Sequence, residues 1–230
     1  MELSKRLQAV ADLVSHGQIV ADVGTDHGYI PIYLIETEKC PRAIAMDINK
    51  GPLLRAKEHI SEHGLSDTIE VRLSDGVSAL SAGECDCVVV AGMGGALAVK
   101  IMEEGQAVFE KLKEFVLQPQ SELAKVRQYL YENQYCVIDE DMVFEDGKFY
   151  PMMKVKNGVP EPYTQVELRY GQGLLAQKHP ILKQFLEKEV HTKEMILTNL
   201  ESESGEHIDN RKKELREELF LVKEALKVYL

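Results

Sequence analysis

Short apolar segments alternate with helical patterns through the first two thirds of the chain, and this alternation restricts the possible folds strongly. The segments of strand length are residues 18–23, 42–48, 68–73, 85–92 and 114–119. Such short, mostly continuous apolar runs are typical of strands buried on both faces. Helical patterns separate them, for example at residues 51–63 and 121–133, the second with Ser121 as its expected N-cap. The pattern predicts a parallel sheet covered by helices on both sides.

The rhythm changes in residues 135–156, where two strand-like segments follow each other without a helix. They meet at Asp146 and Gly147, a dipeptide typical of a two-residue hairpin turn. Five strand–helix units followed by an antiparallel hairpin predict an α/β fold of the class I, Rossmann-like methyltransferase type, with a seven-stranded mixed sheet. A dinucleotide-binding sheet of six parallel strands fits this order less well.

Residues 159–230 are predicted to form a separate helical tail, because Pro160 and Pro162 interrupt the chain and a charged, helical pattern follows from about Pro180. Apolar residues recur there at heptad spacing. The first set, Leu182, Leu186, Ile196 and Leu200, is interrupted by Glu189 and Lys193, and the second set is Ile208, Leu215, Leu219, Val222, Leu226 and Tyr229. We expect an antiparallel helical hairpin, or coiled coil, joined by the polar segment 201–209. It serves either as a packing or dimerisation element or as a part that holds RNA.

Composition limits the classes of function. A chain of 230 residues with 44% apolar content can bury one core and a small appendage. The formal charge of −11 argues against indiscriminate binding of nucleic acid, although the part after Gly158 is nearly neutral, with 11 Lys and Arg against 13 Asp and Glu. No apolar run approaches the ~20 residues of a membrane helix, and the N-terminus lacks the layout of a secretion signal.

The four cysteines are Cys40, Cys85, Cys87 and Cys136. None of them has a spacing typical of a zinc site, so we expect reduced thiols in a cytoplasmic protein and no metal centre. Cys85 and Cys87 could still share a metal, but they also suit the start of a buried strand.

The segment DVGTDHGY, residues 22–29, follows the first expected strand and precedes a helix. In such a unit the loop amides and the helix N-terminus form an electropositive corner, and Gly24 and Gly28 would let a ligand approach the backbone. Asp22, Asp47 and Asp75 stand at the ends of three successive strands, which together predict a nucleoside-containing cofactor. Asp47 suits the ribose hydroxyls and Asp75 the adenine amino group. Alternatively, Asp47 caps the next helix and Asp75 begins a turn.

The fourth expected strand ends in VAGMGG, residues 90–95, which has no proline and no aromatic residue. Enzymes that methylate exocyclic amino groups of bases commonly carry Asn/Asp-Pro-Pro-aromatic at this place. Here the glycines would let the cofactor or the target base approach the backbone, with Met93 as a soft apolar contact. A tight strand-to-helix turn is the alternative.

Several motifs together resemble one family. They are LSKRL at 3–7, DVGTDHGYIPIYL at 22–34, AMDIN at 45–49, SDG at 74–76, AGMGG at 91–95 and LQPQ at 117–120. With the helical tail, they make the chain similar to the bacterial tRNA adenosine-22 N1-methyltransferases over essentially its whole length. The resemblance implies S-adenosylmethionine as cofactor, tRNA as partner and methyl transfer to N1 of adenosine 22, with a coiled-coil tail that helps to hold the tRNA.

This resemblance and the chemistry suggest a role for Asp26. N1 of adenine presents a lone pair, so no proton has to be removed, but positive charge moves from the sulfonium to the base during transfer. Asp26 could hold the adenine amino group and stabilise that charge, or it could merely cap the following helix. His27 could contact the cofactor or the base, or be an ordinary loop histidine. Tyr29 could stack on the base or be buried against the sheet.

The complete set of expected site residues follows from these arguments. Asp26 is the expected catalytic residue. The residues expected to bind the cofactor are Arg6, Asp22, Gly24, His27, Gly28, Asp47, Ile48, Asp75, Gly76, Gly92 and Met93. Those expected to contact tRNA are Tyr29 and the basic cluster Arg211, Lys212 and Lys213.

Three other functions fit the sequence less well. A methyltransferase for another RNA or for a small molecule would share the cofactor residues, and a non-catalytic nucleotide- or RNA-binding module would share the fold. A nicotinamide-dependent dehydrogenase is disfavoured, because Asp26 occupies the second glycine position of GxGxxG.

Overall fold

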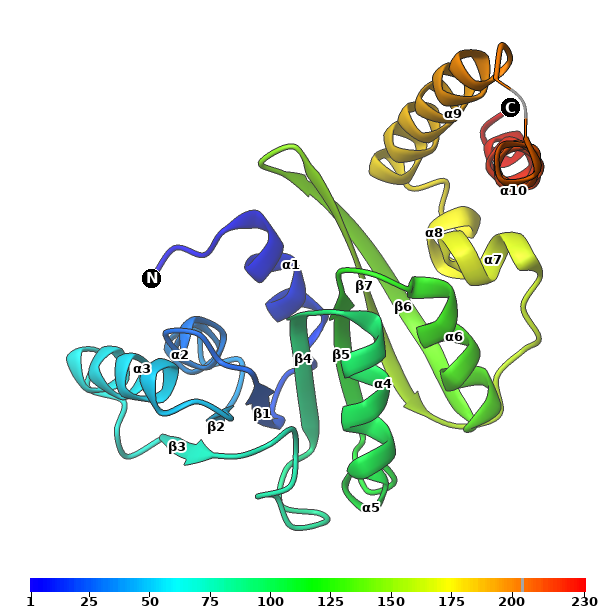
Figure 1. Cartoon of the computed structure of the whole chain (residues 1–230). Helices are drawn as coiled ribbons and strands as arrows, with labels where there is room; N and C mark the ends of the chain where they lie inside the picture. The colour runs from blue at the N-terminus through cyan, green and yellow to red at the C-terminus, as the bar shows by residue number, and fades with distance from the viewer. Residues whose placement is uncertain (204) are drawn as a thin grey trace. The chain divides into compact units, whose positions relative to one another are not determined.

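The computed structural model describes residues 1–203 and 205–230. The chain divides into two compact units, Met1–Glu161 and Pro162–Leu230. A seven-stranded sheet in the order β3-β2-β1-β4-β5-β7-β6 forms the first unit (Figure 1). Its strands are β1 (Ile19–Val23), β2 (Arg42–Asp47), β3 (Ile69–Leu73), β4 (Cys87–Met93), β5 (Glu114–Pro119), β6 (Tyr135–Glu145) and β7 (Lys148–Asn157). Strands β1 to β5 are parallel and β7 is antiparallel to both of its neighbours, which confirms the predicted mixed sheet.

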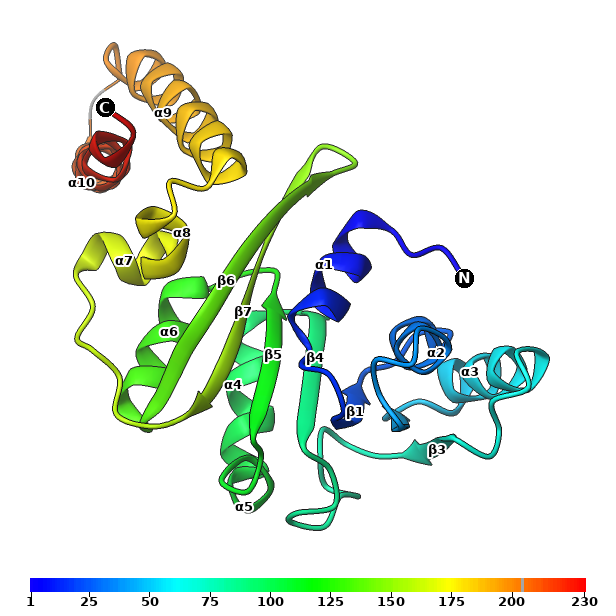
Figure 2. The same ribbon diagram turned by 180° about the vertical axis from the view of Figure 1, so that it is seen from behind.

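Helices cover both faces of the sheet. Those of the first unit are α1 (Lys5–Leu13), α2 (Tyr29–Glu36), α3 (Lys50–Glu62), α4 (Gly95–Glu104), α5 (Gln106–Phe109) and α6 (Leu123–Glu132). Helices α4 and α6 lie in front of the sheet in Figure 1 and behind it in Figure 2. The apolar core divides in the same way: one cluster joins the strands to α4, α5 and α6, and two others join them to α1, α2 and α3.

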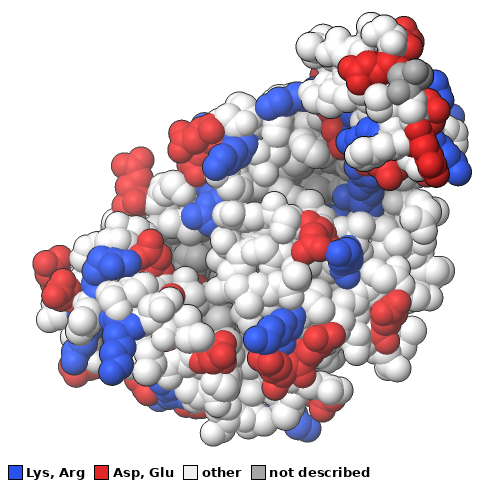
Figure 3. Space-filling model, viewed as in Figure 1, with Lys and Arg blue, Asp and Glu red and all other residues white. Residues whose placement is uncertain are grey.

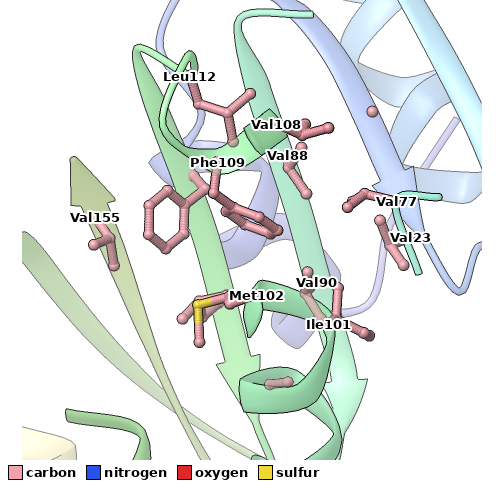
Figure 4. Packing of buried hydrophobic residues seen from close by; sticks show 14 of the residues in the cluster. Val23, Val77, Val88, Val90, Ile101, Met102, Val108, Phe109, Leu112 and Val155 are labelled. Atoms are coloured by element: carbon pink, nitrogen blue, oxygen red, sulfur yellow. The ribbon is translucent and has the colours of Figure 1, made fainter. Parts of the chain in front are cut away.

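Alternate residues of each strand contribute to these two layers. In β4, Val88 and Val90 belong to the cluster shown in Figure 4, together with Ile101 and Met102 of α4 and Phe109 of α5. The intervening residues of β4, Cys87 and Val89, pack on the other side with α1 and α2. This two-sided burial explains why the strands are continuously apolar in sequence.

The strands β6 and β7 form the predicted hairpin. Its turn consists of Asp146 and Gly147, both with positive φ, 48° and 77°. Positive φ at both central residues matches the right-handed twist of the two strands, and Asp-Gly is a favoured sequence for it. The hairpin turn is therefore confirmed.

The prediction that Ser121 caps α6 is wrong. Helix α6 begins at Leu123, after Glu122. The Ser121 hydroxyl instead accepts a hydrogen bond of 3.3 Å from the Gly95 amide at the start of α4. The two segments are very close, because a Cβ on Gly95 would lie 2.4 Å from the Ser121 carbonyl oxygen. The loop after β5 therefore caps the neighbouring helix α4 rather than its own.

The second unit is helical. It contains α7 (Gln165–Tyr170), α8 (Gln172–Ala176), α9 (Pro180–Leu200), α10 (Glu206–Leu226) and a final 3-10 turn, η1 (Lys227–Tyr229). Contacts between distant residues show that α9 and α10 are antiparallel: Lys223 pairs with Glu194 at 2.7 Å, and the Tyr229 hydroxyl donates to the His179 carbonyl at 2.9 Å. The predicted helical hairpin is present. Ser204, in the expected connecting segment, lies outside the described residues.

The contact between α9 and α10 differs in part from the predicted heptad pattern. Leu182, Leu186, Leu215 and Val222 are buried as expected, but Ile196 is 38% exposed. Lys193 is instead half-buried between the helices and forms ion pairs with Glu189 and Glu218. The expectation that Ile196 lies in the contact was wrong, because the ion pair between Lys193 of α9 and Glu218 of α10 occupies part of that contact.

Candidate functional site

The loop between β1 and α2 has an unusual backbone. Gly24, His27 and Gly28 all have positive φ, 73°, 59° and 70°. Gly28 is the N-cap of α2, and no side chain caps that helix end. Asp26 is therefore not a helix cap, which removes the alternative role considered above. An added Cβ on Gly24 would lie 2.2 Å from Cε of Met93 in β4, the end of a flexible side chain that can shift, so the positive φ is the stronger reason for glycine here.

A pocket of about 310 Å³ opens beside this loop. It is lined by Arg6, Leu7, Asp22, Gly24, Asp26, Tyr29, Ile30, Ala91, Gly92 and Gln120. These residues come from α1, from the carboxyl ends of β1 and β4, from the start of α2, and from the loops that follow β1 and β5. Strands β1 and β4 are neighbours whose connections run to opposite sides of the sheet, and ligands of open α/β sheets bind at such a point. The volume is within the range of small-molecule sites, roughly 300–1,000 Å³.

Asp22 lies in the middle of the sheet, opposite Ala45 of β2 and Val89 of β4. It is 5% exposed, and burial raises the pKa of its carboxyl from 3.8 to about 6. The Thr25 side chain opposes this rise, whereas the negative charge of Asp47 adds to it. A buried carboxyl in a pocket wall is suited to a cationic ligand, whose charge would favour the ionised form.

Asp26 is the most exposed acid of the pocket wall. Its side chain is 68% exposed, and Oδ1 lies 3.2 Å from Nη2 of Arg55 and 3.5 Å from Nε2 of His27. Arg55 belongs to α3 and was not among the predicted site residues. Because the pair is formed between half-exposed groups, the carboxylate can exchange this partner for a ligand at little cost.

Arg6 reaches the pocket from α1 and is held by a group that the sequence did not reveal. Its Nη1 donates to Oε1 of Gln118 at 3.2 Å, and its guanidinium lies 5.6 Å from the ring centroid of Tyr150. The same Gln118 oxygen accepts from the Gly92 amide at 3.0 Å. Gly92 interrupts the register between β4 and β5 and has a φ of 78°. Gln118 thus fixes both Arg6 and the turn at Gly92.

Gln118 also has an unsatisfied donor. The residue is completely buried, and its Nε2 has no hydrogen-bond partner among the residues that the structure describes. Buried donors without a partner are rare in folded proteins. Gln118 does not line the pocket, so this donor lies behind the wall that Arg6 and Gly92 form.

The residues expected around the adenosine part of a cofactor lie at the same edge of the sheet but do not line this pocket. Asp47 ends β2, and its Oδ1 accepts from the Asn49 amide at 2.6 Å. It is not the N-cap of α3, which is Asn49. Ile48 is 58% exposed, and Asp75 is exposed in the turn after β3. Gly76 packs against α4, where an added Cβ would lie 3.2 Å from Ile101.

The basic cluster Arg211, Lys212 and Lys213 belongs to α10 of the second unit. Arg211 pairs with Glu214 at 2.9 Å, and Lys212 donates to the Glu203 carbonyl at 2.7 Å. Lys213 is exposed. Two of the three cations therefore already have partners within the tail, which leaves Lys213 as the most available charge of the cluster.

The possible metal ligands and the four cysteines are dispersed over the described residues. Within residues 1–203 and 205–230, no three His, Cys, Asp or Glu side chains are grouped so that they could hold a metal ion. All four cysteines are free thiols. Burial raises the pKa of Cys85 to about 12 and raises that of Cys87 as well, so both remain protonated.

No helix in the described part of the chain is long and apolar enough to cross a membrane.

Comparison with known proteins gives one consistent result. Residues 3–153 match a family model described as a methyltransferase domain. The chain is 34% identical, over 98% of its length and 98% of the relative's length, to the tRNA (adenine(22)-N(1))-methyltransferase of Bacillus subtilis. It superposes with a TM-score of 0.89 and 31% identity on Streptococcus pneumoniae Sp1610 in complex with S-adenosyl-L-methionine, covering 98% of this chain and 100% of that one. For TrmK of M. capricolum in complex with S-adenosyl-homocysteine, the TM-score is 0.86 and the identity 25%, with 99% of each chain covered.

Proposed function

Because this chain belongs to the family of tRNA (adenine(22)-N(1))-methyltransferases, we propose that its pocket brings S-adenosylmethionine and adenosine 22 of tRNA together for methyl transfer to N1. The observation that carries this proposal is the match over 98% of both chains, since it includes the pocket and the tail alike. The reaction also suits a protein of the cytoplasm, because tRNA is found there.

The residues present fit the cofactor. S-adenosylmethionine supplies a methyl group on a positively charged sulfur, and it also carries an amino and a carboxyl group. Arg6 would bind the carboxylate, and the buried Asp22 would face the cationic groups. Gly24 and Gly92 leave the backbone accessible, and Gln118 holds Arg6 and the Gly92 amide through its Oε1. Asp47 would hold the ribose hydroxyls, and Asp75 with Gly76 the adenine, while Ile48 would cover the ring.

The other pocket residues would act on the target base. Asp26 would accept a hydrogen bond from the adenine amino group and stabilise the positive charge that develops on the ring as the bond to N1 forms. No residue has to remove a proton from N1, so the site needs no general base. Tyr29 lines the pocket beside Asp26 and offers a face on which the base can stack.

The direct test is a transfer experiment with a matched substrate pair. Purified protein, labelled S-adenosylmethionine and an unmodified tRNA transcript should give 1-methyladenosine at position 22, identified by nuclease mapping and mass spectrometry. A transcript with guanosine at position 22 should remain unlabelled. Label at another position, or label that does not depend on adenosine 22, would favour a methyltransferase for a different RNA site.

A further inference from the structure

One face of α3 extends the rim of the pocket. Arg55 and His59 are one helical turn apart and therefore share a face of this helix. The Arg55 guanidinium lies 3.2 Å from the Asp26 carboxylate, and its side chain is 48% exposed. The chain has a formal charge of −11, so a cation at this rim is a local feature rather than part of a general basic surface.

A group of rings connects the pocket with His59. The rings of His27 and Tyr29 are stacked, with centroids 5.3 Å apart and an interplanar angle of 11°. The His59 ring lies 5.1 Å from that of His27 and 5.7 Å from that of Tyr29. Of the three, Tyr29 lines the pocket. The positive φ of His27, uncommon for a residue with a side chain, is part of this arrangement.

The pair between Arg55 and Asp26 is weak enough to be exchanged. Both groups are about half exposed or more, and ion pairs in such surroundings contribute little stability. An RNA phosphodiester can replace the carboxylate as a bidentate partner of a guanidinium, and the neighbouring phosphates of the chain add to the electrostatic attraction. If Arg55 moved to a phosphate, the Asp26 carboxylate would become free to accept a hydrogen bond from the target base.

We propose that the α3 rim, Arg55 and His59, binds the nucleotide next to the target adenosine. Arg55 takes its phosphate, His59 offers a ring on which its base can stack, and the departure of Arg55 releases Asp26 for the adenine amino group. This inference rests on the proposed function, because it assumes that the pocket receives a base of an RNA chain.

Equilibrium binding of an unmodified tRNA transcript at several salt concentrations tests the inference. Arg55→Ala should raise the dissociation constant about tenfold at low salt and reduce the slope of log K against log salt by about 0.7 to 0.9, the value for one phosphate contact. Arg55→Lys should restore most of the slope. His59→Ala should raise the dissociation constant about fivefold or more without changing the slope, because stacking does not release counterions.

Lys57→Ala is the matched control, since it removes one positive charge from an exposed position of the same helix. The inference is overturned if Arg55→Ala has the same affinity and slope as Lys57→Ala. It is also overturned if Arg55→Ala lowers only the single-turnover rate, because Arg55 would then merely hold Asp26. If the wild-type protein does not methylate adenosine 22, the proposed function is overturned, and this inference with it. If the wild-type protein methylates adenosine 22 but Arg55→Ala binds tRNA as the wild type does, only the inference is overturned.

Discussion

The Asp22 carboxyl lies between β2 and β4 and still forms part of the pocket wall. Its pKa in the folded protein is about 6, above the ordinary value of 3.8. Between these two values the folded state binds more protons than the unfolded state, so stability falls as the pH rises through this interval and stays reduced above it. At pH 7 the ionised carboxyl lowers the free energy of unfolding by about 3 kcal/mol.

Replacing Asp22 by asparagine should therefore stabilise the protein and impair its pocket. In the absence of cofactor, Asp22→Asn should raise the free energy of unfolding by about 3 kcal/mol at pH 7, and the gain should disappear near pH 4. Denaturant unfolding at both pH values measures this. Binding of S-adenosylmethionine at pH 7, measured by calorimetry, should weaken. An equal change of stability at the two pH values would show that burial of the charge is not its cause.

The sequence revealed those site residues that are part of local motifs, and missed those that depend on distant contacts. Asp22, at the end of β1, and Gly24 and Asp26, in the loop that follows it, belong to one short sequence motif, and all three line the pocket. Gln118 is 112 residues from Arg6, and Arg55 is 29 residues from Asp26, so neither contact has a signal in residue spacing. Only the pairing of the strands brings these residues together.

Helix α1 depends on the β6–β7 hairpin for its position. At the end of β6, the Glu145 carboxylate accepts hydrogen bonds from the amides of Lys5 at 2.7 Å and Arg6 at 3.4 Å. Ser4 satisfies a third amide, that of Leu7, at 3.3 Å. A carboxylate at a helix N-terminus also interacts favourably with the helix dipole. The hairpin thereby holds the helix that carries Arg6 into the pocket.

Removing this contact should affect both stability and the cofactor site. Glu145→Ala should lower the free energy of unfolding by about 1 kcal/mol, as expected for loss of a cap, and should weaken S-adenosylmethionine binding severalfold because Arg6 is less firmly held. Thermal unfolding and calorimetry measure the two effects. Asp12→Ala removes an exposed acid from the other end of α1 and serves as control. A lower melting temperature with unchanged cofactor affinity would show that Glu145 stabilises α1 but does not influence how Arg6 binds the cofactor.

Elements with strong local patterns were predicted well, and short or charged ones were not. The five parallel strands and the Asp-Gly hairpin follow from continuous apolar runs and from a turn with two positive φ angles. Helices α7 and α8 have only 6 and 5 residues, too few for a helical period to be visible. Ile196 was misplaced because Lys193 of α9 pairs with Glu218 of α10 between the helices, a contact between distant residues that an apolar pattern cannot predict.

On the scale of the whole molecule, the net negative charge argues that tRNA binding depends on a few basic side chains and not on a generally basic surface. Lys and Arg are interspersed with Asp and Glu on the face shown in Figure 3, in accordance with a formal charge of −11. Phosphate contacts would then come from particular side chains, and we propose Arg55 and Lys213 for this role. We therefore keep the assignment of the helical unit to tRNA binding as a proposal that needs its own test.

Removal of residues 162–230 provides that test, because the chain before them forms a compact unit with its own core. The truncated protein should bind S-adenosylmethionine with unchanged affinity, and its dissociation constant for tRNA should rise at least tenfold, with a smaller dependence on salt. Calorimetry and filter binding provide the two values. Full methylation activity of the truncated protein would mean that the tail is only a packing or dimerisation element.

The single-turnover rate of methyl transfer in Asp26 variants tests the central claim most directly, with cofactor and tRNA both saturating. Asp26→Ala should lower this rate roughly 10²-fold or more, comparable with the loss of a positioned polar catalytic group, while cofactor affinity changes much less. Asp26→Asn keeps an acceptor for the adenine amino group but removes the charge, so it should also be strongly impaired. A normal rate in the Asn variant would contradict the electrostatic role, and a normal rate in the Ala variant would contradict any catalytic role of Asp26.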